Sequence, residues 1–101
     1  MNIKRKKEGS NLSVTVNGRI DTATAPAFEA EVKPYLDGVT NLTIDFKDVN
    51  YVSSAGLRVL LSLQKKMMVQ GEMKLINVSE AVNDVFEVTG FDEILTYEMS
   101  E

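Results

Sequence analysis

Apolar residues recur with two different periods along this chain, and the two periods alternate. Segments in which apolar and polar residues take turns are typical of strands with one face on a core. They lie at residues 12–16 and 41–46. Residues 73–78 supply another strand, residues 94–97 a short closing strand, and residues 2–7 are a weak strand candidate. Segments with helical spacing follow Thr22, Ser54 and Ser79. The order strand, strand, helix, strand, helix, strand, helix, strand predicts an α/β fold, a single domain over residues 1–101 with a mixed β-sheet and right-handed β-α-β crossovers.

Capping and breaking residues place the ends of the predicted helices. Residues 22–26 form a helix entry, with a threonine cap and Pro26 in the first turn. Pro34 predicts a kink or an early end of this first helix, because proline removes a hydrogen bond and clashes one turn back. Gly71 is placed to end the second helix, and Ser79 and Gly90 bracket the third.

The second helix is unusually apolar. At about 100° per residue one stripe combines Leu57, Leu60, Leu61, Gln64 and Met68. Val59, Leu63 and Met67 widen this stripe to more than half of the circumference. The polar side consists of Arg58, Ser62, Lys65 and Lys66. A helix of this kind is either packed on two sides or keeps part of its apolar surface for a partner.

Composition excludes several classes of function. The net charge of −4 argues against nucleic acid as a direct partner, since phosphate contacts need a basic surface. The basic run at residues 4–7 could be an anion or membrane patch, but alternation would split it between two faces, which favours a solvated edge strand. No segment is apolar for long enough to insert into a membrane, and no signal peptide is evident. Together with the absence of cysteine, this indicates a cytoplasmic protein.

Two adjacent serines, Ser53 and Ser54, stand where the second helix begins. In the simplest interpretation one of them caps the helix and the other is a polar loop residue. Catalysis by a serine is disfavoured: the chain has no histidine or cysteine, and Lys65 and Lys66 lie roughly 16 to 18 Å from Ser54 along the helix. No Gly-rich phosphate loop or metal-ligand set is present, so we expect no enzyme activity, no cofactor and no metal. A helix start can instead accept a phosphate on serine.

Several motifs resemble those of the STAS domain, and specifically its small bacterial form, the anti-sigma factor antagonist. Gly18-Arg19-Ile20-Asp21 follows the second strand, and Leu42-Thr43-Ile44-Asp45-Phe46 forms the central strand. The most specific part is the run from Val49 to Leu61, which contains Ser53-Ser54-Ala55-Gly56-Leu57. The segment from Ser79 to Phe91 completes a resemblance that covers nearly the whole chain.

The resemblance implies a partner-switching protein. In this family the serine two positions before Gly-Leu, here Ser54, is phosphorylated by an anti-sigma factor that is itself a serine protein kinase. The unphosphorylated form binds that anti-sigma factor, the phosphorylated form releases it, and a phosphatase resets the switch. One residue departs from the family pattern, because Ser53 stands where phosphorylated members usually have aspartate. Ser53 is therefore the second choice of acceptor, and a domain that is never phosphorylated is a further possibility.

We expect the partner to contact the loop around the two serines, the start of the second helix and the nearby loop after the second strand. The predicted partner-binding residues are Asp21, Thr22, Ser53, Ser54, Ala55, Gly56, Arg58, Val59 and Ser62. An alternative is a STAS subunit of another assembly, such as a lipid-transport ATPase or a sensory complex, without a phosphorylation switch. A third hypothesis, an enzyme or small nucleotide-binding protein, ranks last because the usual catalytic side chains are missing.

Overall fold

The computed structural model describes all residues from 1 to 101 and contains five strands and three α-helices. In chain order the elements are β1 (Asn2–Glu8), β2 (Asn11–Asn17), α1 (Ala25–Val32), β3 (Asn41–Asp48), α2 (Ser54–Gln70), β4 (Glu72–Val78), α3 (Glu80–Thr89) and β5 (Tyr97–Met99). Two short 3₁₀ turns, Lys33–Tyr35 and Phe91–Glu93, follow α1 and α3. The predicted order of strands and helices is confirmed.

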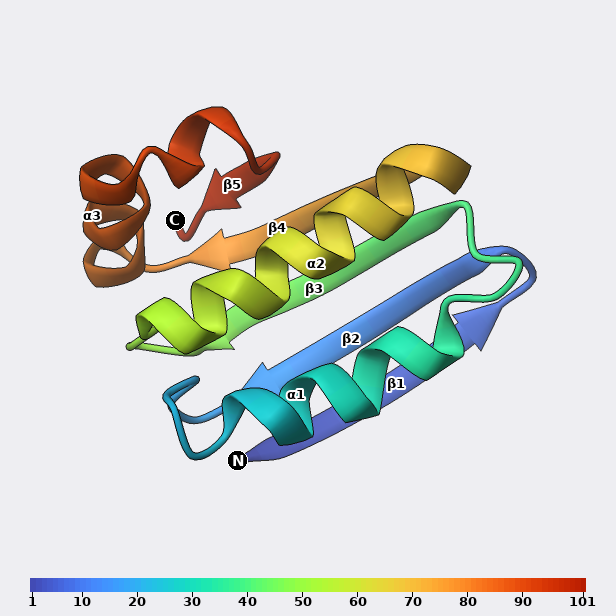
Figure 1. Cartoon of the computed structure of the whole chain (residues 1–101), viewed down its shortest axis with the longest axis horizontal. Helices are drawn as coiled ribbons and strands as arrows, with labels where there is room; N and C mark the ends of the chain where they lie inside the picture. The colour runs from blue at the N-terminus through green and yellow to red at the C-terminus, as the bar shows by residue number, and fades with distance from the viewer.

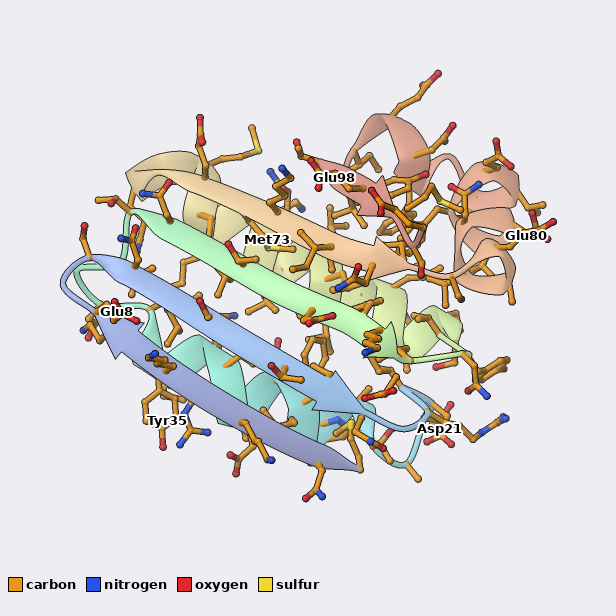
Figure 2. The ribbon with its side chains drawn as sticks, turned by 180° about the vertical axis from the view of Figure 1, so that it is seen from behind. Glu8, Asp21, Tyr35, Met73, Glu80 and Glu98 are labelled. Carbon is orange, nitrogen blue, oxygen red and sulfur yellow. The ribbon has the colours of Figure 1, made fainter.

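The five strands form one mixed sheet in the order β1-β2-β3-β4-β5. The hairpin partners β1 and β2 are antiparallel, whereas β2 and β3, β3 and β4, and β4 and β5 are parallel. Helices α1 and α2 lie side by side over one face of the sheet, and α3 lies beyond the C-terminal end of β4 (Figure 1). Seen from behind, the opposite face of the sheet has no helix over it (Figure 2). Because the strands joined by crossovers are parallel, both α1 and α2 begin at the same end of the sheet.

The core lies between the sheet and the two helices. Alternate residues of β2 (Leu12, Val14, Val16) and β3 (Leu42, Ile44, Phe46) are buried, as the period of two predicts. All buried residues with side chains are hydrophobic. Helix α2 buries one side only, and Met68, predicted to lie on the apolar stripe, is 71% exposed. Met67 reaches the single sheet face against which α2 packs, and Met68 does not. Part of the apolar stripe is therefore left exposed, which is one of the two arrangements expected for this helix.

The end of α1 agrees with the prediction, whereas the start of β5 differs from it. Helix α1 ends at Val32 and continues as a 3₁₀ turn containing Pro34, so the predicted early end is confirmed. The last strand begins later than expected, since Ile94 precedes it and Leu95 enters the core from a loop. Gly90 adopts a left-handed conformation and turns the chain into the 3₁₀ segment Phe91–Glu93. This segment lies between α3 and β5, so the last strand begins only after it.

Strand β1 is at the edge of the sheet, and its basic residues divide between two faces as predicted. Arg5 lies on the helix side, where its guanidinium is 2.6 Å from the Glu31 carboxylate and 3.8 Å from the centre of the Tyr35 ring. Lys7 also reaches this side and donates to the Asp37 carbonyl. The run at residues 4–7 is therefore an exposed edge strand and not one continuous basic patch.

The C-terminal end of α2 is fixed to the loop before β3. The side-chain amide of Gln70 donates to the carbonyls of Leu36 and Val39 at 2.6 and 2.7 Å. At Gly71 the backbone passes so close to Thr40 that an added Cβ would lie only 2.0 Å from the Thr40 carbonyl oxygen. Only glycine fits this crossing, which holds α2 in place along the sheet.

Candidate functional site at the start of helix α2

The start of α2 is built where the loops after β2 and β3 meet. The backbone N–H of Ile20 donates to the Tyr51 carbonyl at 3.0 Å, and the N–H of Ser53 donates to the Ile20 carbonyl at 2.8 Å. Ile20 and Val52 thereby form an isolated parallel bridge. Two loops that are about thirty residues apart in the sequence are thus joined directly beside the two serines.

Ser53 and Ser54 have different structural roles. Ser53 is the N-cap residue of α2, with extended backbone geometry, and its Oγ accepts the Gly56 N–H at 3.2 Å. Ser54 is the first residue of the helix, is exposed, and its hydroxyl forms no hydrogen bond with another residue. The Ser54 hydroxyl is therefore free for chemistry at the positive end of a 17-residue helix, whereas the Ser53 hydroxyl stabilises that end.

Gly56 allows the helix to approach the bridge between the two loops. A Cβ added at Gly56 would lie 2.8 Å from Ile20 Cγ2, 2.9 Å from Val52 Cγ1 and 3.0 Å from the Ile20 carbonyl oxygen. Two carbon atoms in favourable contact are about 3.5 to 4.0 Å apart. The glycine is thus required by packing, and it sets the position of Ser53 and Ser54 relative to the β2–α1 loop.

Asp21 organises the loop that enters α1. Its Oδ1 accepts the N–H groups of Ala23 and Thr24, both at 3.0 Å. The Thr24 hydroxyl accepts the Asp21 N–H at 2.8 Å and donates to the Arg19 carbonyl at 2.7 Å. The sequence predicted a threonine cap, but the Thr24 side chain makes no capping bond to α1, because its hydroxyl is engaged with the loop. The carboxylate of Asp21 satisfies the N–H groups at this helix entry instead.

The electrostatic surroundings of Asp21 favour its charged form. The Thr24 N–H donated to the carboxylate lowers the pKa of Asp21 most, and partial desolvation opposes it. The Thr24 hydroxyl, the Ala23 N–H and the charge of Arg19 lower this pKa further. Asp21 therefore presents a fixed negative charge beside the start of α2 at neutral pH.

A stacked arginine lies between these two loops and was not predicted from the sequence. The guanidinium of Arg19 lies 4.2 Å from the centre of the Tyr51 ring, and its Nε is 3.8 Å from an Asp21 carboxylate oxygen. Arg19 and Tyr51 are exposed, and they directly precede Ile20 and Val52, the two residues of the bridge between the loops. The separate motifs around Asp21 and Ser53 contained both residues, but nothing in either motif indicated that the two side chains would stack.

The nine predicted partner-binding residues fall into three groups of exposure. Thr22, Ser54 and Arg58 are exposed, and Asp21, Ser53, Ala55 and Ser62 are half-buried. Gly56 is buried and Val59 is only 8% exposed. The expectation that Val59 borders the partner surface is wrong, because its side chain points into the core with Leu60 and Leu63. Gly56 likewise acts through packing and not as part of the surface.

The site offers a nucleophile without a partner base. No cluster of three or more His, Cys, Asp or Glu residues able to hold a metal ion exists in the chain. None of the helices combines the length and apolar character needed to cross a membrane. An exposed hydroxyl, a fixed carboxylate and a stacked guanidinium are suited to recognition by a protein partner and to modification from outside.

Comparisons with known proteins show the family of this chain. The STAS domain family matches residues 2–101. The anti-sigma-B factor antagonist of Bacillus subtilis is 32% identical over 96 residues, which are 94% of this chain and 88% of that protein. BtrV of Bordetella bronchiseptica is 36% identical over 93 residues, 90% of this chain and 80% of BtrV. A crystal structure of an anti-sigma factor antagonist from Mycobacterium paratuberculosis matches with a TM-score of 0.84 at 25% identity, covering 95% of this chain and 83% of that one. This chain therefore belongs to the STAS domain family.

Proposed function

We propose that this protein is an anti-sigma factor antagonist that works by partner switching. The unmodified chain binds an anti-sigma factor through the exposed start of α2 and the adjoining loop at Asp21 and Thr22. The observation that carries the proposal is the free, exposed Ser54 hydroxyl at the helix start, in a chain whose relative in Bacillus subtilis is an anti-sigma-B factor antagonist. In this function the protein is a binding module and not an enzyme.

Phosphorylation of Ser54 by the anti-sigma factor, acting as a serine protein kinase, would end the complex. A phosphate adds close to two negative charges and three acceptor oxygens to the centre of the contact surface. The partner surface that fits a neutral hydroxyl then meets a bulky dianion, and repulsion and desolvation disfavour the complex. The antagonist itself stays folded, because the unpaired N–H groups at the start of α2 stabilise the added charge. A phosphatase that removes the phosphate restores binding.

Ser54 is a better acceptor than Ser53 for a geometric reason. The Ser53 hydroxyl accepts the Gly56 N–H and its side chain is half-buried, so a kinase would have to withdraw it from the helix cap. The Ser54 side chain is exposed and has no such bond. Ser53 stands where the family usually has aspartate, and it forms no hydrogen bond with the Ser54 side chain, so this difference leaves the Ser54 hydroxyl free.

A second candidate function is a STAS subunit of another assembly, such as a lipid-transport ATPase or a sensory complex, that lacks a phosphorylation switch. The observation that favours it is Ser53 in the position where phosphorylated family members usually have aspartate. Affinity capture from the source cell separates the two functions. Recovery of a kinase-type anti-sigma factor supports the antagonist, and recovery of transport or sensory subunits without such a kinase supports the alternative.

Intact-mass measurement tests the switch directly. The chain is incubated with the anti-sigma kinase of its own genome and ATP, and the mass of one added phosphoryl group is expected. Ser54→Ala is expected to abolish this gain, and Ser53→Ala is the matched control that retains it. No gain, or a gain that survives Ser54→Ala, contradicts the assignment of Ser54.

A further inference from the structure

A basic groove runs between the end of α1 and the exposed side of α2. It is shallow and open to solvent, has a volume of about 490 Å³, and is lined by Lys33, Arg58, Leu61, Ser62, Lys65 and Lys66. Four of the six lining residues are cationic and none is acidic, although the chain as a whole carries a net charge of −4. This concentration of positive charge is local, and neither the overall charge nor the basic run on β1 predicts it.

The cations in the groove are largely without partners inside the protein. Lys33 donates to the Ser62 hydroxyl at 2.8 Å, which links α1 to α2, and lies 3.9 Å from the Glu29 carboxylate. Arg58, Lys65 and Lys66 take part in none of the five ion pairs or the side-chain hydrogen bonds of the structure. By contrast, Arg5 and Lys74 each contact a carboxylate at 2.6 Å. The basic side chains of the groove are therefore available to an external anion.

The geometry of α2 arranges these cations as a stripe. Arg58, Ser62 and Lys65 lie within one narrow side of the helix, and Lys66 flanks it. From Arg58 to Lys66 the helix rises roughly 12 Å. Ser54 precedes Arg58 by four residues, so it occupies the N-terminal end of the same stripe. The groove thus continues the surface around Ser54 along the helix.

We propose that this groove binds an acidic segment of a protein partner, with carboxylates spaced along one side of a helix. The inference deepens the proposed function, on which it rests, by naming the chemistry of the partner contact. A row of carboxylates at positions i, i+4 and i+7 spans the same length as the stripe from Arg58 to Lys65. Leu61 is the only hydrophobic lining residue, so the groove offers little to insert into lipid.

A two-residue charge reversal with a matched control tests the groove without any kinase. The probe is a synthetic helix-forming peptide with glutamates at i, i+4 and i+7, titrated into the ¹⁵N-labelled full chain and followed by amide chemical shifts. Saturable shifts are expected at Arg58, Ser62, Lys65 and Lys66. Lys65→Glu/Lys66→Glu should weaken binding about tenfold, and the loss should shrink at high salt because the charges are exposed.

The control is Lys4→Glu/Lys47→Glu, which changes the net charge equally at two exposed lysines outside the groove. It should change the affinity less than about threefold, because these charges act only through the long-range field. Lys65→Gln/Lys66→Gln gives an intermediate loss and replaces the glutamate variant if that variant loses its dispersed spectrum. Equal losses in both charge reversals, or shifts centred on residues 4 and 47, overturn the proposal.

Two further titrations test whether the groove binds a small anion or a membrane surface instead of an acidic peptide. Inorganic phosphate that produces the same shifts at the same concentration as the peptide overturns the proposal in favour of a small-anion site. Phosphatidylglycerol vesicles that bind the chain while the peptide causes no shift overturn it in favour of a membrane surface. Because the peptide titration needs neither ATP nor Ser54, its failure leaves the phosphorylation result standing, and loss of phosphorylation leaves the titration standing.

Discussion

Replacing Gly56 by alanine tests how tightly α2 is pressed against the loop bridge at the proposed site. The new Cβ would lie 2.8 Å from Ile20 Cγ2, about 0.7 Å short of the roughly 3.5 Å at which two carbon atoms are in favourable contact. Overpacking of this kind costs about 1 to 3 kcal/mol. The same Cβ lies 3.0 Å from the Ile20 carbonyl, which accepts the Ser53 N–H, so relieving the clash weakens a hydrogen bond worth about 1 kcal/mol.

The higher helix propensity of alanine opposes these costs by about 1 kcal/mol. The expected net loss in the free energy of unfolding for Gly56→Ala is therefore about 2 kcal/mol. For a domain of this size it corresponds to a fall in Tm of roughly 8 to 16 °C. Thermal unfolding followed by circular dichroism, together with urea denaturation, measures both quantities.

Val69→Ala is the matched control, because Val69 is an exposed residue of the same helix. Its free energy of unfolding should change by no more than about 0.5 kcal/mol. If Gly56→Ala is as stable as the parent chain, α2 has room to move away from Ile20, and the argument that packing requires glycine here is refuted.

Three further predictions concern the cap, the loop and the end of α2. Ser53→Ala should lower the free energy of unfolding by about 1 kcal/mol, and Ser79→Ala, which removes an equivalent cap bond of 3.2 Å from α3, should cost a similar amount; urea denaturation showing no loss for either would contradict the capping role. Folding lowers the pKa of Asp21, so the contribution of this carboxylate to stability is complete above the unfolded pKa of about 3.9 and is lost as the pH falls through the folded value. Asp21→Asn should therefore make the free energy of unfolding fall less steeply with decreasing pH. An equal slope in Asp21→Asn and the parent chain would contradict this role of Asp21. Gly71→Ala should destabilise the fold by about 3 kcal/mol or more, since the Thr40 carbonyl 2.0 Å away is backbone and cannot rotate aside; soluble expression with an unchanged Tm would show that the crossing is looser than described.

The sequence was sufficient to predict the architecture because burial in this fold is one-sided. A sheet covered by helices on one face imposes a period of two on its strands, and β2 and β3 show it without exception. Serine before an apolar helical run predicted that α2 and α3 would be capped, and Ser53 and Ser79 both accept the expected N–H. Strand periodicity and helix caps depend on residues close together in the sequence, so they can be predicted without knowledge of tertiary contacts.

Features that depend on tertiary contacts were missed or placed wrongly. The apolar arc of α2 is too wide to show which part faces the sheet, so the sequence does not separate Val59, which is 8% exposed, from Met68, which is 71% exposed. The stacking of Arg19 on Tyr51 joins two loops that only the folded sheet brings together. The basic groove needs the end of α1 beside α2, and Lys33 and Lys66 are too far apart in the sequence to indicate this.

The contrast between the two neighbouring serines has a practical consequence for engineering. The Ser53 hydroxyl accepts a backbone N–H of α2, whereas the Ser54 hydroxyl has no hydrogen bond within the protein. Residue 54 can therefore be substituted without changes elsewhere in the chain. Under the proposed switch, an acidic residue there would mimic the released form and alanine would keep the bound form, while cysteine would provide an attachment point for a fluorescent reporter. An acidic residue at this first helical position should raise the free energy of unfolding by about 0.3 to 1 kcal/mol, because it lies at the positive end of α2, whereas alanine and cysteine should change it little. All three proteins would stay folded, so position 54 can be changed to alter binding alone.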